Sequence, residues 1–200
     1  MLNSNTAAMR KITHPEAQKA LLKWFDMLSE RYAAPGKPQV NGRAWRAEMK
    51  RMEPPYGAMM CEGYGALLEQ LTEYMPLRAI DKMALALFVS VAAHIKSNKQ
   101  TLSFAAQLGE KVNGAAPVLS SLRFERLQKA SDPEAFCQLL IRAVKIRADN
   151  GVNVLSLADS IFLWMEEWQQ REEHQPENHN PFARNRIRWA SEYLSTARAK

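Results

Sequence analysis

The sequence predicts an all-α protein built from two small helical bundles joined by a short linker. Apolar residues recur at the three- and four-residue spacing of helices, and no segment alternates with the period of two that a strand requires. Proline and glycine interrupt these periodic segments at intervals that suit helices of ordinary length. With 200 residues, 46% of them hydrophobic, the chain can bury a proper core. We expect the N-terminal bundle over residues 13–111 and the C-terminal bundle over residues 118–198.

The N-terminal bundle is expected to begin near Pro15, after a disordered lead-in over residues 1–12. Proline suits the first helical position, and Thr13 or His14 would be the cap. The segment 81–96 is apolar on nearly every side, so a helix there must be surrounded by protein. By the same criteria, the other helices of this bundle are predicted over residues 41–53, 56–73 and 103–111.

The C-terminal bundle is organised around two helices that meet at Ser131-Asp132-Pro133. Asp132 is a favourable N-cap and Pro133 a favourable first residue, because the N–H that proline lacks would have no partner there. Two more helices are predicted over residues 154–173 and 181–197. The helix after the turn has Arg142 and Lys145 on one face. Its opposite face is an apolar stripe of Phe136, Leu139, Leu140, Ala143, Val144 and Ile146.

The helix before this turn combines apolar and basic residues. At about 100° per residue, its apolar residues cover one broad face, with Arg123 in the middle and Arg126 near the edge. A guanidinium flanked by apolar residues needs an anionic or carbonyl partner. Either an internal ion pair or a nucleic-acid backbone contact would satisfy Arg123. The apolar residues of this face are Leu119, Leu122, Phe124, Leu127 and Ala130.

The net charge of +6 favours an anionic partner, most simply nucleic acid. Arg43, Arg46 and Lys50 follow at i, i+3 and i+7, so they share one helix face. This face is either a solvated charged surface or a strip for phosphates. The excess of arginine favours phosphates, whose oxygens a guanidinium binds through two parallel hydrogen bonds. Lys96 and Lys99 belong to a basic loop that either reaches a phosphate backbone or is a plain solvated turn.

The sequence offers no catalytic constellation. It has no glycine-rich phosphate loop and no nucleophile motif, and Cys61 and Cys137 lack metal-ligand spacing. Both cysteines are expected to be buried free thiols, as in a reducing cytoplasm. The longest apolar run, residues 83–95, is too short to span a bilayer, and the N-terminus lacks an apolar signal core. We therefore expect a cytoplasmic protein without catalysis, cofactor or metal, and we expect Trp189 to pack rather than stack on a base.

The segment RFERLQKASD, residues 123–132, is the most specific part of a longer resemblance. It follows the basic helix RAWRAEMKRM, the apolar helix LALFVSVAAH and the segment LSFAAQLG. It precedes EAFCQLLIRAVKI, a helix around FLW and a last helix with RxRWASEYL. In this order, over residues 17–194, the chain resembles the CasB family, the small subunit of the type I-E CRISPR surveillance complex Cascade.

The resemblance implies an all-α, non-catalytic protein of antiviral defence. Two copies would lie head to tail along the inner face of Cascade, in contact with the repeated backbone subunits and the large subunit. Their basic surface would hold DNA while the guide RNA pairs with the target strand and displaces the other strand. By holding these nucleic acids the subunit would stabilise the R-loop.

The family's basic positions carry over to several residues of this chain. This chain departs from the family pattern at MEEWQQREE, residues 165–173, where relatives can carry basic residues. That acidic stretch is expected to be protein-facing or solvated, and Arg184, Arg186 and Arg188 either substitute for the missing cations or face solvent. Spacing alone adds Lys50, Arg126 and Lys145 to the nucleic-acid-binding set. The positions that match the family pattern itself are Arg43, Arg46, Lys96 or Lys99, Arg123, Lys129 and Arg142.

Two other functions fit the residues. A helix-turn-helix regulator would use the turn at 131–133, although the helix after it is apolar over more than half its face and offers few base-reading side chains. A protein-interaction adaptor would pair its arginines with the acids of a partner. A sequence-specific footprint on duplex DNA would favour the regulator. Partner binding without salt-dependent nucleic-acid binding would favour the adaptor, and an enzyme ranks last.

Overall fold

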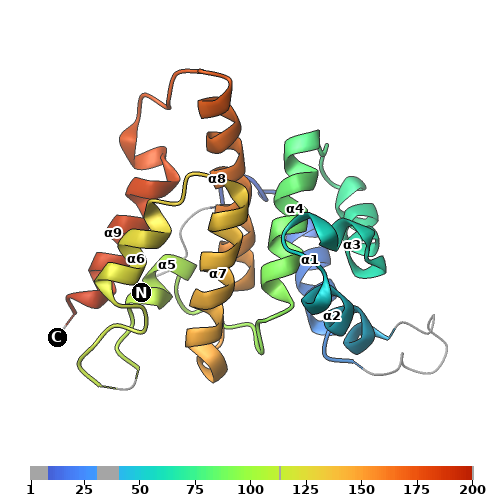
Figure 1. The fold of residues 1–200 in the computed structure, drawn as a ribbon, viewed down its shortest axis with the longest axis horizontal. Helices are drawn as coiled ribbons and strands as arrows, with labels where there is room; N and C mark the ends of the chain where they lie inside the picture. Colours follow the sequence, from blue (N-terminus) through green and yellow to red (C-terminus); the bar gives the residue numbers. More distant parts are fainter. Residues whose placement is uncertain (1–8, 31–40, 113, 200) are drawn as a thin grey trace.

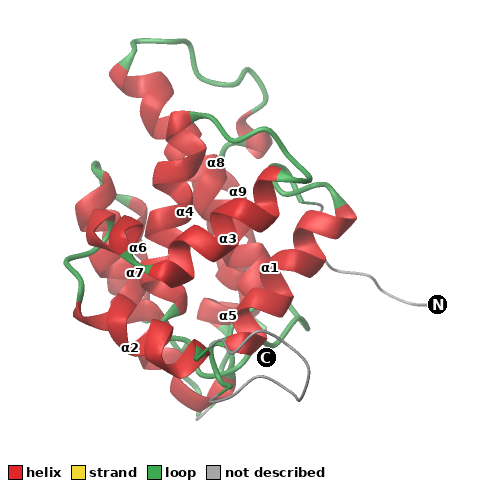
Figure 2. Cartoon of the chain, turned by 90° about the vertical axis from the view of Figure 1, so that its right-hand side faces the viewer, coloured by secondary structure: helices red, strands yellow, loops and turns green. Residues whose placement is uncertain are grey.

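The computed structural model describes residues 9–30, 41–112 and 114–199, which form helices, turns and one isolated bridge (Figures 1 and 2). The prediction of an all-α fold is confirmed. The first half contains α1 (Pro15–Met27), α2 (Gly42–Arg51), α3 (Glu62–Thr72), α4 (Ala79–Ala92) and α5 (Phe104–Gly109). The second half contains α6 (Ser121–Gln128), α7 (Pro133–Arg147), α8 (Val154–Glu172) and α9 (Asn185–Ala197). Short 3₁₀ turns are η1 (Tyr56–Met60), η2 (Ala148–Asn150) and η3 (Pro181–Ala183), so the predicted helix over 181–197 is divided between η3 and α9.

Two predicted helix starts are confirmed by their capping hydrogen bonds. The His14 ring accepts a 3.2 Å hydrogen bond from the Glu16 amide at the start of α1. The Asp132 carboxylate accepts a 2.8 Å hydrogen bond from the Ala135 amide at the start of α7. Proline is the first residue of both helices. The cap at Asp132 begins α7 only a few residues after α6 ends, which keeps these two helices adjacent.

The predicted continuous helix over 56–73 is wrong. Residues Tyr56–Met60 form η1, and α3 begins only after Cys61, whose extended backbone (φ −90°, ψ 142°) separates the two. The break brings Gly63 close to Trp45, where a Cβ on Gly63 would lie 3.2 Å from the Trp45 Cβ. The Gly63 carbonyl also accepts a 2.7 Å hydrogen bond from Trp24 Nε1. Tertiary contacts of the two tryptophans therefore override the helical pattern.

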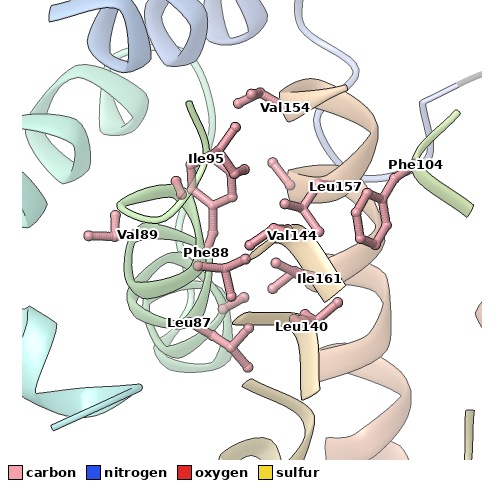
Figure 3. Close-up of a cluster of buried hydrophobic side chains, with 14 of the residues drawn as sticks. Leu87, Phe88, Val89, Ile95, Phe104, Leu140, Val144, Val154, Leu157 and Ile161 are labelled. Atoms are coloured by element: carbon pink, nitrogen blue, oxygen red, sulfur yellow. The ribbon is translucent and has the colours of Figure 1, made fainter. Parts of the chain in front are cut away.

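The centre of the core lies where α4, α7 and α8 meet. Figure 3 shows Leu87 and Phe88 of α4 gathered with Leu140 and Val144 of α7 and Ile161 of α8. Each of these side chains is at most 2% exposed. Burying one large apolar side chain contributes about 1.5–3 kcal/mol. The prediction that the fourth helix is surrounded by protein is confirmed.

Elements of both predicted bundles contribute to this core. Helix α5, which lies in the range predicted for the N-terminal bundle, packs against α9, and α4 packs along α8. In Figure 1, α5 and α9 lie together on the left, and α1 to α4 lie on the right. The close approach of α5 to α9 requires Gly109, where a Cβ would collide with Thr196 Oγ1 and the Tyr193 carbonyl oxygen. The division at residues 112–118 stays a prediction.

The prediction of a disordered lead-in is wrong for residues 9–12, and residues 1–8 lie outside the described ranges. The amides of Arg10, Lys11 and Ile12 all donate to the Asp159 carboxylate of α8, at 2.6–3.0 Å. Ile12 is fully buried. The anchor is 147 residues away from Ile12 in the chain, so local pattern could not reveal it.

The two cysteines and Trp189, which were predicted to be buried, lie in the interior. Cys61 and Cys137 are free thiols in the interior, and burial raises the pKa of the Cys137 thiol to about 12. Trp189 is 1% exposed and its Nε1 donates to Ser160 Oγ at 3.0 Å. This tryptophan therefore packs rather than stacks on a base. Among the described helices, none has the length and apolar character needed to cross a membrane.

Candidate nucleic-acid interface

Helix α6 is shorter than its apolar pattern suggested. Because it covers only Ser121–Gln128, Leu119 and Ala130 lie outside it, and the projection that placed Arg123 within an apolar face does not apply. Phe124 and Leu127 are the buried residues of α6, whereas Arg123 is exposed. The prediction that Arg123 lies in the middle of an apolar face is therefore wrong. It lies at the edge of the helix, beside α7.

A groove of about 440 Å³ lies between α6 and α7. Four cations line it, Arg123 and Arg126 from α6 and Arg142 and Lys145 from α7, and no acidic residue does. All four are exposed, and none forms an ion pair with another described residue. A cleft lined by one sign of charge attracts ligands of the opposite sign. The remaining lining residues are apolar: Leu119, Leu127, Leu139, Ala143 and Ile146.

Lys145 connects this groove to α2. The pKa of Lys50 on α2 is lowered by partial burial and by the nearby charges of Arg46 and Lys145. His94, just after α4, lies beside them, and burial followed by the charges of Lys145 and Lys50 lowers its pKa to about 4. His94 is therefore neutral at pH 7. We call the α6–α7 groove together with Arg43, Arg46 and Lys50 the basic track; in Figure 1, the α7 ribbon lies between those of α6 and α2.

Two nitrogens of the Arg46 side chain have no hydrogen-bond partner among the described residues. Its guanidinium carbon lies 5.7 Å from the centre of the Phe25 ring, and its Nε and Nη2 are buried without a partner among the described residues. A buried donor without a partner costs about 1–3 kcal/mol, and these two atoms are turned towards the protein, so the Arg46 side chain would have to move before they could contact a ligand. Arg43, one turn earlier on α2, is exposed and donates from Nε to the Ser29 carbonyl at 2.9 Å.

Three other predicted residues have partners within the fold. Lys129 pairs with Glu125 at 2.6 Å, and Lys96 pairs with Asp149 at 2.8 Å. Both pairs are exposed, and such pairs contribute about 0–1 kcal/mol, so either lysine can exchange its acid for a phosphate. The Lys99 amide donates to the Val152 carbonyl at 2.9 Å. The basic loop is thus hydrogen-bonded to the turn before α8 instead of extending away from the fold.

The comparison with protein families identifies the chain. The family model of CRISPR-associated protein Cse2 matches residues 45–194, three quarters of the chain. The chain belongs to the Cse2 family. No curated protein and no solved structure matches it.

Cse2 is the CasB small subunit of type I-E Cascade, so the resemblance drawn from the sequence is confirmed. The family match begins inside α2 and ends inside α9. It includes every predicted site residue except Arg43. This Cse2 chain is thus a small subunit of a CRISPR Cascade complex, from a family of structural subunits.

Arg188 of this Cse2 chain neither faces solvent nor is available to replace the missing cations after α8. Its side chain is 10% exposed, its Nη2 donates to Ser160 Oγ at 2.8 Å, and its Nη1 lies 3.9 Å from Asp159. Arg184 pairs with Glu177, and Arg186 is exposed. Arg188 is therefore a structural residue, and the two expectations offered for it are both wrong.

The acidic end of α8 is partly protein-facing, as one of the two expectations stated. Glu166 accepts from Lys11 at 2.9 Å and from Arg78, the N-cap residue of α4, at 3.1 Å. Glu167 accepts from the Asn185 amide at 2.8 Å, and burial raises the pKa of this carboxyl. These acids hold the N-terminal segment, α4 and the start of α9 to α8.

Sequence reasoning missed the apolar part of the groove. Leu139 and Ile146 were expected in the core stripe of α7, yet Leu139 is half-buried and Ile146 is 38% exposed. A usable signal was present, because Leu139, Arg142 and Ile146 follow at i, i+3 and i+7 and so form one mixed edge of α7. An edge that mixes apolar and basic residues is suited to a ligand with apolar and anionic parts.

Proposed function

We propose that this Cse2 subunit holds nucleic acid along the basic track without catalysing a reaction. The observation that carries the proposal is the set of four cations around the α6–α7 groove, none neutralised by a described residue. Lysine and arginine that neutralise phosphates release condensed counterions, which favours binding at moderate salt. The exposed cations Arg43 and Lys50 extend the same surface onto α2.

The proposed role is to stabilise the R-loop during antiviral defence. Replacing a DNA duplex by a guide RNA–target heteroduplex is nearly balanced in free energy, so a few backbone contacts tip it. Phosphate contacts carry no sequence information, which suits a subunit that must serve any guide. In this proposal two copies lie head to tail along the backbone subunits and the large subunit, and they contact guide RNA and the target and displaced DNA strands.

The fold argues against the regulator hypothesis. A recognition helix reads bases with its N-terminal residues. The N-terminal residues Pro133, Phe136 and Cys137 of α7 are buried. The exposed face of this end begins with Glu134, whose carboxylate repels phosphates, so this end of α7 is poorly suited to a major groove. The adaptor hypothesis remains an outcome of the following experiment.

Reconstitution tests the proposal. Guide-loaded Cascade lacking its small subunit is mixed with this protein, and target-DNA affinity and strand opening are measured at two salt concentrations. We expect both to rise when the subunit is added. The double variant Arg142→Ala/Lys145→Ala should lower affinity and reduce the slope of log affinity against log salt by about 0.7 to 0.9 per cation removed.

The matched control removes two exposed lysines of α1, Lys19 and Lys23. The net charge changes equally in Lys19→Ala/Lys23→Ala and in the track variant, so a loss specific to the track variant assigns the effect to position. Equal losses would contradict the proposal, because net charge alone would then explain binding. Incorporation into Cascade without any effect on DNA affinity would favour the adaptor.

A further inference from the structure

The apolar lining of the α6–α7 groove is not needed for holding phosphates. Phosphates interact with cations at a surface and gain nothing from an apolar cavity. Yet five of the nine lining residues are apolar, and Leu139 and Ile146 remain partly exposed there. An apolar recess ringed by cations fits a ligand with a flat apolar part between anionic groups.

A nucleobase in a single strand is such a ligand. The cavity of about 440 Å³ lies within the range of about 300–1,000 Å³ typical of small-molecule sites. Arginine side chains offer apolar stems and planar guanidinium groups that stack on bases. Bases in a duplex are already stacked on each other and are not free to enter, so the recess discriminates against duplex DNA.

We infer that the α6–α7 groove takes one unstacked base of a single-stranded nucleic acid, while Arg123, Arg126, Arg142 and Lys145 contact the flanking phosphates. The inference rests on the proposed function, since it assigns the ligand of the same surface. It adds that the subunit prefers an unpaired strand and that part of this preference comes from apolar contact. Leu139 and Ile146 are the residues that provide that contact at the open side of the groove.

The test compares two oligonucleotides with the full-length protein at two salt concentrations. One is oligothymidylate, and the other is an abasic oligonucleotide of the same length, which carries the same number of phosphates and no bases. We expect oligothymidylate to bind about fivefold or more tightly, as for one base contact. Both oligonucleotides should show the same salt slope, because both contact the same cations.

Two variants separate the apolar contact from the charges. Leu139→Gln/Ile146→Gln keeps every cation and should abolish the preference for oligothymidylate with the salt slope unchanged. Its matched control is Leu122→Gln, which removes an apolar residue of α6 that is 67% exposed and does not line the groove. Arg142→Ala/Lys145→Ala should weaken binding of both oligonucleotides and lower both slopes.

The outcomes distinguish the two proposals. Equal affinities for the two oligonucleotides, with salt-dependent binding intact, would overturn the base-binding inference and leave the proposed function standing. Failure of the protein to bind either oligonucleotide in a salt-dependent manner would overturn both. A preference that survives in Leu139→Gln/Ile146→Gln would also overturn the inference, because the base would then bind elsewhere.

Discussion

Replacing Asp159 by alanine should destabilise the protein more than a substitution of any exposed residue. Its carboxylate is the common acceptor for three backbone amides of the N-terminal segment. Two of these bonds are part-buried and one is buried. We therefore take the lower end of the cost of a buried amide that loses its acceptor, about 1 kcal/mol for each amide. Asp159→Ala should therefore lower the free energy of unfolding by about 3 kcal/mol.

Urea unfolding followed by circular dichroism measures this change. Asp26→Ala, which removes an exposed carboxylate from α1, is the matched control and should alter stability by less than about 0.5 kcal/mol. Asp159→Asn should fall between the two, because its amide oxygen still accepts while its NH₂ group opposes the Arg10 amide. If Asp159→Ala unfolds at the same urea concentration as the control, the anchoring role of this residue is refuted.

Two further predictions concern a glycine and a histidine. Gly109→Ala should destabilise the protein by about 1–3 kcal/mol, because the added Cβ collides with α9. Gly65→Ala has open space around its Cβ and should stabilise the protein by about 0.4–1 kcal/mol. Urea unfolding curves of the two variants check the sign of each change. The folded-state pKa of His94 is about 4, below its ordinary value of 6.5, so the unfolded chain binds more protons between these values and stability falls as the pH drops from about 6.5 towards 4. His94→Gln should flatten this part of the pH profile, whereas His174→Gln, in an exposed loop, should leave it unchanged; identical profiles for both variants would exclude His94 as the cause.

Local chemistry was enough to predict where helices begin and which one is central. The Asp132-Pro133 start of α7 follows from one capping hydrogen bond and one fixed backbone angle. The burial of α4 follows from apolar residues around its whole circumference. Both depend on residues close together in the chain, which is why sequence reasoning reached them.

The features that sequence reasoning missed depend on distant partners. The surroundings of Arg123 were misjudged because α6 covers only Ser121–Gln128, and Leu119 and Ala130, which lie on either side of it, were counted on its face. Arg147 is fully buried, with its guanidinium donating to the carbonyls of Gln107 and Gly151. No local pattern marks an arginine for such a position, since its acceptors come from α5 and from the turn after α7.

The candidate site was predicted as a set of cations but not as a shape. The spacing of Arg43, Arg46 and Lys50 indicated a shared face of α2, and the neutral state of His94 beside Lys50 emerged only from packing. Lys145 connects two groups that the sequence treated separately. The groove is lined by residues of both α6 and α7, and how two helices are placed against each other depends on the packing of the whole core.

The contact of residues 10–12 with Asp159 has a consequence for synthesis on the ribosome. At about 5–20 residues per second, α8 leaves the ribosome roughly 7–30 seconds after the N-terminal segment that it anchors. Helix α4 is synthesised about midway through that interval and lacks α8, the helix along which it packs, for the rest of it. The nascent chain must therefore keep its most apolar helix from aggregating until late in translation, which makes the first half of this subunit a natural client for chaperones that bind exposed apolar segments.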